Sequence, residues 1–279
     1  EDTSSMYNGC ISLEFTGDMA DNIKNAEAMF CDCTKLKKIG HLSKSLENAK
    51  SMFNGCIDLK MINKNIDLPN VIKYADYMFY GCTNLNANVY YSSSLETAQG
   101  MFRNCSSMEN FRDVANLTCL SNMNSMFLGC TNATFSALTK CPPNVTDLRY
   151  CFSNCSNLQL PTDFFDNVVS SAVDASSCFR NCTSLTNRID VKNTFNADSM
   201  FRENGATETS NIAPSYWGSM YEDCINLTTI NSGMYTLMQN NPTNGRRCFR
   251  NCINIINPDT YDNLDTLYHD WMYKGIVVV

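Results

Sequence analysis

Cysteine is the residue in this chain with the widest range of possible chemistry, because a thiolate can bind zinc, form a disulfide or act as a nucleophile. The chain has 16 cysteines and two histidines, His41 and His269, which lie near opposite ends. Closely spaced cysteine pairs occur at Cys31/Cys33, Cys151/Cys155, Cys178/Cys182 and Cys248/Cys252. Structural zinc sites favour sets of four Cys or His ligands, and here the first cysteine of three pairs replaces a recurrent methionine. We therefore expect no metal site.

Catalysis by a thiol or hydroxyl needs a base close to the nucleophile and a third group that orients the base. Neither histidine lies beside a recognisable nucleophile motif, and no glycine-rich phosphate loop or acidic calcium loop is present. The sequence predicts no catalytic residues, no cofactor and no enzymatic activity. A formal net charge of −7 without a basic run argues against nucleic-acid binding, and no apolar stretch is long enough to span a bilayer.

The cysteines belong to an internal repeat in which Met or Cys, an aromatic residue, two residues, Cys, two residues and an apolar residue follow one another. Twelve copies begin at Met6-Tyr7, Met29-Phe30, Met52-Phe53, Met78-Phe79, Met101-Phe102, Met126-Phe127, Cys151-Phe152, Cys178-Phe179, Met200-Phe201, Met220-Tyr221, Cys248-Phe249 and Met272-Tyr273. The motif cysteine is present in ten copies, the exceptions being Asn204 and Ile276. The segment from Phe201 to Trp217 is the least regular, and we expect an altered turn there.

Each copy has features of a short helical turn followed by a strand. Alanine often stands three residues before the Met, so that Ala, Met and the aromatic fall on one helical face, as in Ala75, Met78 and Phe79. The third residue after the Met is Gly, Asn or Asp in eleven of twelve copies, which are the residues that accept a left-handed conformation. Polar residues on both sides of the motif Leu, such as Lys35 and Lys37, indicate a half-buried strand.

Stacked copies of such a unit predict an α/β repeat solenoid, leucine-rich-repeat-like and right-handed, with about twelve turns of short parallel strand plus helical turn. We expect a single solenoid domain over residues 1–279, as a segment of a longer chain whose ends contact flanking domains or other chains. The aromatic residues and the cysteines should form two buried columns. Since parallel side chains in one column are poorly placed for a disulfide, we expect free thiols.

The motif Ala-x-x-Met-Phe-x-x-Cys-x-x-Leu, seen at Ala75–Leu85 and Ala98–Met108, resembles the BspA-like leucine-rich repeats of bacterial surface proteins. It is similar to the Met-Phe variant, which also occurs in gut bacteriophage proteins. The resemblance implies a repeat solenoid that recognises a host or partner surface. The regular Ser-Asn-Val-Thr segment of the commoner family pattern is missing upstream of the Met-Phe pair.

These features favour a non-enzymatic adhesion module, located at the cell surface or outside the cell, that binds a protein or glycan. A bacteriophage virion component, such as a tail fibre, head fibre or receptor-binding protein, is the alternative, and an intracellular scaffold is a weaker third. The residues on either side of the motif Leu should face solvent. Our candidate binding residues on this surface are Lys35, Lys37, Lys60, Asn84, Asn86 and Glu109. Lys35, Lys37, Lys38 and Lys60 would form its one basic patch, although a solvated charged face is the simpler explanation.

Overall fold

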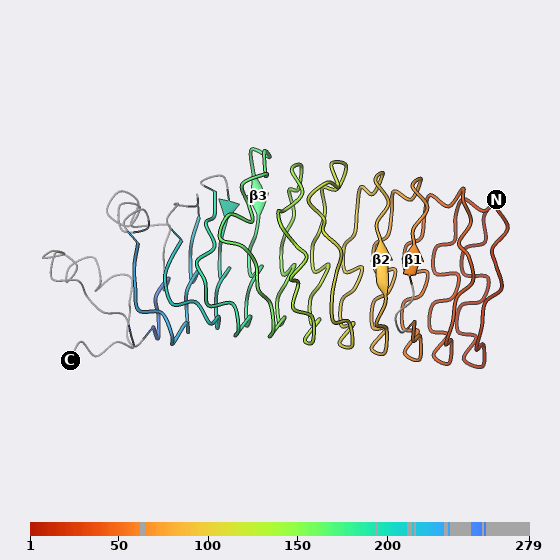
Figure 1. The fold of residues 1–279 in the computed structure, drawn as a ribbon, viewed down its shortest axis with the longest axis horizontal. Helices are drawn as coiled ribbons and strands as arrows, with labels where there is room; N and C mark the ends of the chain where they lie inside the picture. The colour runs from red at the N-terminus through yellow and green to blue at the C-terminus, as the bar shows by residue number, and fades with distance from the viewer. Residues whose placement is uncertain are drawn as a thin grey trace, which may run out of the picture.

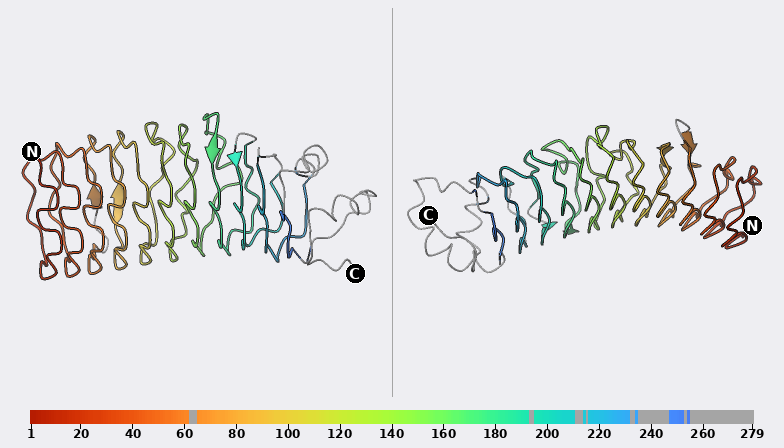
Figure 2. Two further views of the ribbon diagram at one scale, coloured as in Figure 1. Left: turned by 180° about the vertical axis from the view of Figure 1, so that it is seen from behind. Right: turned by 90° about the horizontal axis from the view of Figure 1, so that it is seen from below.

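The computed structural model describes residues 1–61, 65–192, 195–210, 216–231 and 247–252, together with Pro214, Met234 and Asn254. Eleven of the motif copies lie in these ranges, and the twelfth, at Met272-Tyr273, lies outside the described residues. Successive copies stack side by side along an elongated, gently curved body, with the N-terminus at one end (Figures 1 and 2). The chain is therefore a repeat solenoid, as the sequence predicts.

The motif segments are joined by two alternating kinds of backbone hydrogen bond. In the third copy, the N–H of Met52 bonds back to the carbonyl of Ala49 at 3.2 Å, and this bond closes a turn within the copy. The N–H groups of Ser51 and Phe53 instead bond forward to the next copy, to the carbonyls of Asp76 and Met78, at 2.8 and 2.9 Å. Along the motif, every second backbone N–H thus bonds within its own copy, and the N–H groups between them bond to the next copy.

The expected α-helical turn does not form at the motif in the described residues, where the segment is a run of tight turns. The reason is that two positions of each copy are left-handed, which interrupts any helix. The third residue after the Met has positive φ in all eleven described copies, including Glu203, so the prediction for this position is confirmed. The residue just before the Met is left-handed as well, as at Ala28, Ser51 and Tyr77.

Regular strands are short and parallel, and each pairs with the neighbouring repeat. β1 (Asn65–Asp67) pairs with β2 (Asn88–Tyr90), and β3 (Val173–Asp174) pairs with β4 (Phe195–Asn196). A line of parallel pairs runs along the stack, made of single bridges except for the step from Asp174 to Asn196, which is the β3–β4 pair. Its residues, each paired with the next, are Asp2, Asn25, Asn48, Tyr74, Thr97, Asn122, Asp147, Asp174, Asn196 and Tyr216. This line passes four residues before the motif Met, whereas the sequence placed the strand around the motif Leu.

The core consists of the expected columns. Phe53, Phe79, Phe102 and Phe127 are fully buried, and their rings stack with centroids 5.6, 5.7 and 6.0 Å apart. The column of stacked or tilted rings runs from Tyr7 to Phe249. A second column contains the fully buried Cys56, Cys82, Cys105 and Cys130. Both predicted columns are confirmed.

The sequence leads us to expect an altered turn between Phe201 and Trp217, and part of that segment, residues 211–213 and 215, lies outside the described residues. Ser199, Phe201 and Glu203 each donate a backbone hydrogen bond to the next copy, at 2.8 to 2.9 Å, as their equivalents do elsewhere. In this copy Asn204 replaces the motif cysteine, and the exposed Thr207 stands at the position of the motif Leu. At the N-terminal end the first copy leaves Met6, Ile11 and Phe15 exposed. The corresponding features of the other end, Ile276 to Val279, lie outside the described residues.

Candidate functional site

The motif cysteines form a ladder of hydrogen bonds. Each sulfur donates to the main-chain carbonyl of the aromatic residue in the preceding copy, as from Cys56 to Phe30 at 3.1 Å and from Cys105 to Phe79 at 3.0 Å. The same contact recurs at Cys33, Cys82, Cys130, Cys155, Cys182, Cys224 and Cys252. The cysteine therefore serves as a small apolar side chain with one weak donor, directed at a buried carbonyl oxygen.

Burial keeps these thiols in the neutral form. It raises the pKa of the ladder thiol Cys224 to about 12 and the pKa of Cys82 and Cys130 well above the ordinary value, and it raises the pKa of Cys31, which lies outside the ladder, to about 11. The thiolate is the form that attacks substrates and binds metals, so the ladder thiols are poor nucleophiles and poor ligands. All 16 cysteines are free, and only Cys10 and Cys119 are exposed.

The described residues contain neither a group of metal ligands nor a membrane-spanning helix. Within these ranges no group of three Cys, His, Asp or Glu side chains is placed to hold a metal ion. Among the same residues no helix has the length and apolar character needed to span a bilayer. His41 is exposed, and His269 lies outside the described residues.

The candidate binding residues lie on the surface expected for them, which we call the Leu-flanking strip: Lys35, Lys37, Lys60, Asn84, Asn86 and Glu109. All are exposed except Asn86, which is half-buried, while the adjacent Leu36, Leu59 and Leu85 are fully buried. Backbone hydrogen bonds hold part of the strip in register, from Lys37 to Glu14 at 2.8 Å and from Lys60 to Lys37 at 3.3 Å. Equivalent positions of the strip thus recur from turn to turn.

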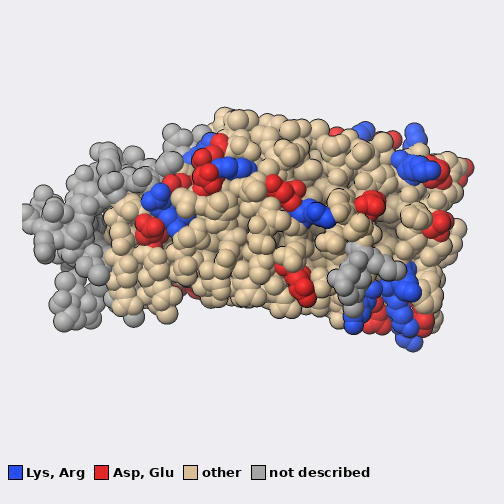
Figure 3. All heavy atoms as spheres, in the orientation of Figure 1, with Lys and Arg blue, Asp and Glu red and all other residues tan. Residues whose placement is uncertain are grey.

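The basic patch is partly neutralised. The Lys37 ammonium lies 2.9 Å from the Glu14 carboxylate, and the Lys38 ammonium lies 5.7 Å from the centre of the Phe15 ring. Lys35 and Lys60 form no ion pair with the residues that the structure describes. On the face drawn in Figure 3, Lys and Arg gather beside Asp and Glu at the N-terminal end, and much of the middle is uncharged. The patch is a mixture of charges rather than a strongly basic surface.

A second polar surface, which the sequence reasoning missed, follows the line of parallel bridges. We call it the Asx ladder: Asp2, Asn25, Asn48, Asn122, Asp147, Asp174 and Asn196. Each side-chain oxygen accepts the N–H two residues later, as Asn122 does from Asn124 at 2.9 Å and Asp174 from Ser176 at 3.0 Å. This is the Asx-turn arrangement. The recurrence of Asn or Asp four residues before the Met was the signal in the sequence.

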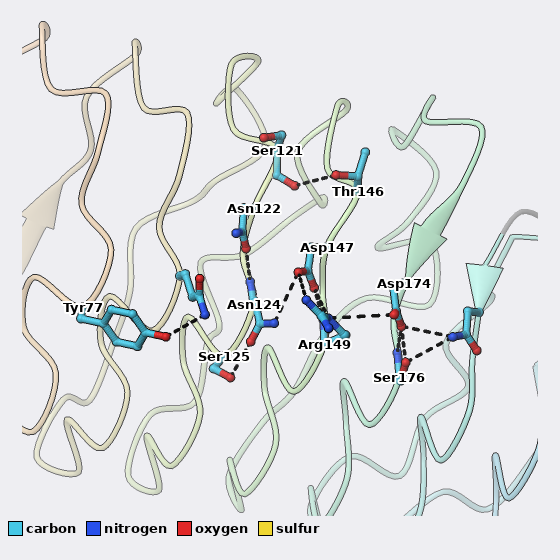
Figure 4. Close-up of polar contacts among 12 residues, drawn as sticks. Tyr77, Ser121, Asn122, Asn124, Ser125, Thr146, Asp147, Arg149, Asp174 and Ser176 are labelled. Carbon is cyan, nitrogen blue, oxygen red and sulfur yellow. Dashed lines mark hydrogen bonds and ion pairs between the residues drawn. The ribbon is translucent and has the colours of Figure 1, made fainter. Parts of the chain in front are cut away.

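The ladder is also connected from one turn to the next (Figure 4). Asn124 donates to Asp147 at 3.4 Å, and Arg149 pairs with Asp147 at 2.7 Å and lies 3.9 Å from Asp174. Burial raises the pKa of Asp147, but hydrogen bonds from Arg149 and Asn124 outweigh that effect and hold the pKa below its ordinary value. Asp198, on the same side, has a raised pKa because of burial. The arrangement is a rigid row of hydrogen-bond donors and acceptors.

Two family sequence models match this chain. The model of the BspA type leucine rich repeat region matches six copies over residues 3–134. A model described as a Mycoplasma protein of unknown function, DUF285, matches residues 116–217. No curated protein matches the chain in sequence.

Solved structures of leucine-rich repeat proteins are distantly similar. One, a leucine-rich repeat protein from Bacteroides ovatus, is 18% identical, with a TM-score of 0.35, over 90% of this chain and 80% of that one. Another, a leucine rich cell surface protein from Faecalibacterium prausnitzii, is 13% identical, with a TM-score of 0.42, over 83% of this chain and 64% of that one. Residues 3–134 of this chain are therefore similar to the BspA type leucine rich repeat region.

Proposed function

We propose that this chain is a non-enzymatic recognition module that binds a protein or a glycan on a host or partner surface. The observation that carries the proposal is the Leu-flanking strip, in which Lys35, Lys37 and Lys60 project from adjacent turns of a rigid stack. Equivalent positions on successive turns present polar or charged groups at a regular spacing, which suits an extended partner. Asn84, Asn86 and Glu109 continue the strip as hydrogen-bonding groups.

The buried core supports this role. Stacked rings and inter-turn hydrogen bonds fix the backbone of every described turn, so little conformational entropy is lost when the strip engages a partner. The ladder thiols are neutral and buried, so their part is structural. The proposal includes display at the cell surface or outside the cell, right-handed winding and a twelfth turn at Met272-Tyr273.

A triple substitution tests the strip: Lys35→Ser, Lys37→Ser and Lys60→Ser, measured for binding to an array of sulfated and sialylated glycans. We expect at least a tenfold loss of binding, while thermal unfolding changes little because exposed charges contribute little to stability. The matched control replaces Lys24, Lys73 and Lys140 with Ser, which removes the same charge from lysines paired with carboxylates elsewhere. Equal losses of binding in both triple variants would show that the effect comes from the net charge of the protein alone. Unchanged binding by the first would remove the basic patch from the proposal.

The full-length gene tests whether the protein is displayed on a cell or on a virion. A lipobox or a cell-wall anchor in the same gene supports display on a cell. Neighbouring capsid or tail genes would instead identify the protein as a bacteriophage virion component. The same strip would then contact a receptor or another structural protein.

A further inference from the structure

The third repeat interrupts the stacking on the side of the solenoid that carries β1 and β2. Motif methionines are 23 residues apart from Met29 to Met52 and from Met78 to Met101, but 26 apart from Met52 to Met78. On this side Phe15 bridges to Lys38, and β1 pairs with β2. Between these two pairs, no bridge or hydrogen bond joins residues 38–42 to residues 65–68. The longer repeat therefore leaves two backbone edges unpaired with each other.

A cavity of about 1040 Å³ opens at this interruption, and we call it the repeat-three cleft. Its apolar wall includes Met19, Leu42 and Leu68. Its polar wall includes Asp18, Asp21, His41, Lys44, Asp67, Asn70 and Tyr90. A hollow with an apolar wall, a few polar groups and an aromatic side chain has the composition of a ligand site. β1 and β2 lie beside it, near the N-terminal end of the body (Figure 1).

The charge of the cleft is negative. Asp21 is paired with Lys44 at 2.9 Å. Asp18 accepts the backbone N–H of His41 at 2.8 Å and has no cationic partner in the described part of the chain. Asp67 is exposed and likewise has no ion pair or side-chain hydrogen bond there. Asp18 and Asp67 thus have no cationic partner among the residues that the structure describes, and the apolar walls of the cleft strengthen the attraction of these carboxylates for a cation.

Tyr90 adds an aromatic contact of the kind that cations favour. The guanidinium carbon of Arg112 lies 4.2 Å from the centre of the Tyr90 ring, and Arg112 also donates a hydrogen bond to the Tyr90 hydroxyl, so part of this ring already holds a guanidinium group. Tyr90 is still exposed, and it also lines the cleft. The combination of aromatic ring and carboxylates matches the planar, charged side chain of arginine.

We propose that the repeat-three cleft binds an extended, arginine-containing peptide segment of a partner protein. One arginine lies between the Asp18 and Asp67 carboxylates and beside Tyr90. The peptide backbone pairs with one of the edges that repeats two and three leave free, as an added β-strand does. This site is separate from the Leu-flanking strip, so the two proposals stand or fall independently.

The test uses the full chain and a fluorescent peptide of alternating threonine and arginine, with binding followed by fluorescence anisotropy. We expect saturable binding that weakens at least fivefold in Asp67→Asn and in Asp18→Asn. The matched control is Asp58→Asn, which removes one exposed carboxylate from the surface beside the motif Leu and should bind as wild type does. Tyr90→Leu keeps an apolar side chain in place and should also weaken binding, with unfolding temperature measured to confirm that the variant is folded.

A second peptide, with citrulline in place of arginine, has the same shape without the charge and should bind at least tenfold more weakly. Equal binding of the two peptides overturns the proposal, as does an equal loss in Asp58→Asn and Asp67→Asn. No detectable binding of the arginine peptide at about 1 mM, the weak limit of useful affinity, also overturns it. If a neutral glycan binds instead and depends on Asp67 and Tyr90, the cleft is a sugar site and the peptide proposal is wrong.

Discussion

The side-chain nitrogen of Asn204 lies 3.1 Å from the main-chain carbonyl oxygen of Phe179, in the place where the neighbouring turns put a cysteine sulfur. Asparagine thus keeps the hydrogen bond to this carbonyl and replaces the sulfur donor with an amide nitrogen. Asn204 also accepts the N–H of Ala206 through its side-chain oxygen at 2.8 Å. The one exception to the cysteine ladder among the described copies thus follows the same physical rule as the cysteines.

Replacing Asn204 tests this rule. Asn204→Ala removes both contacts in a buried site and should lower the free energy of unfolding by about 2 to 4 kcal/mol, since unmet buried polar groups cost about 1 to 3 kcal/mol each. Asn204→Cys restores the donor to Phe179 but leaves the Ala206 N–H unpaired, so its loss should be smaller. Urea denaturation compares the two. A Cys variant no more stable than the Ala variant would show that the donor to Phe179 contributes nothing.

The aromatic column should dominate the stability of each turn. Phe102 is fully buried and stacks on both Phe79 and Phe127, so Phe102→Ala should cost about 3 to 5 kcal/mol, the usual loss on emptying a large core site. The control is Phe15→Ala, because Phe15 is 53% exposed and should cost little. Denaturant unfolding of the two variants measures the difference, and similar losses would contradict the burial of the column.

Thiol labelling of the native protein should divide the cysteines into two groups. Cys10 and Cys119 are exposed and should react rapidly, and the half-buried Cys31 should react slowly. The remaining thirteen are buried and should react only after denaturation. Mass spectrometry of the labelled peptides identifies the sites. Rapid labelling of Cys82 or Cys130 would show that the ladder is open to solvent.

Stability should also fall at alkaline pH. The ladder thiols have folded pKa values above the ordinary 9.0, for example about 12 at Cys224, because burial disfavours the thiolate. Below about pH 9 both states hold these protons, and above it the unfolded chain loses protons that the folded chain keeps. The free energy of unfolding should therefore be constant through neutral pH and decline from about pH 9 upward. Thermal melts from pH 7 to 11 test this, and a flat profile above pH 9 would contradict it.

The left-handed turn position should accept asparagine in place of glycine. Gly81 has a φ of 70°, and no atom lies within 4 Å of the place that a Cβ would occupy. Asn104 holds the same position in the next copy with a φ of 62°. Gly81→Asn should change stability by less than about 1 kcal/mol, whereas Gly81→Val should cost about 2 kcal/mol or more, because a β-branched side chain is strained in this region. Thermal unfolding distinguishes the two outcomes.

The sequence by itself determined what repeats in this protein. Because each copy puts the same apolar residues at the same spacing, only stacking buries them all, and the columns at Phe79 and Cys82 follow without further information. The left-handed position after the Met was also readable, since Gly81 and Asn104 are residue types with that preference. The exposed sides of the motif Leu were predicted correctly for the same reason of alternation.

Only the tertiary structure decided how the turns are closed and where they join. The second left-handed position is occupied by Ala28, Ser51 and Tyr77, which have no intrinsic preference for it, so the bonds to the next copy impose it. The same bonds exclude the helix that the spacing of Ala, Met and Phe favoured. The line of bridges and the repeat-three cleft depend on which segments of neighbouring copies lie beside each other. This register is set only when the copies stack, so the sequence of a single repeat does not specify it.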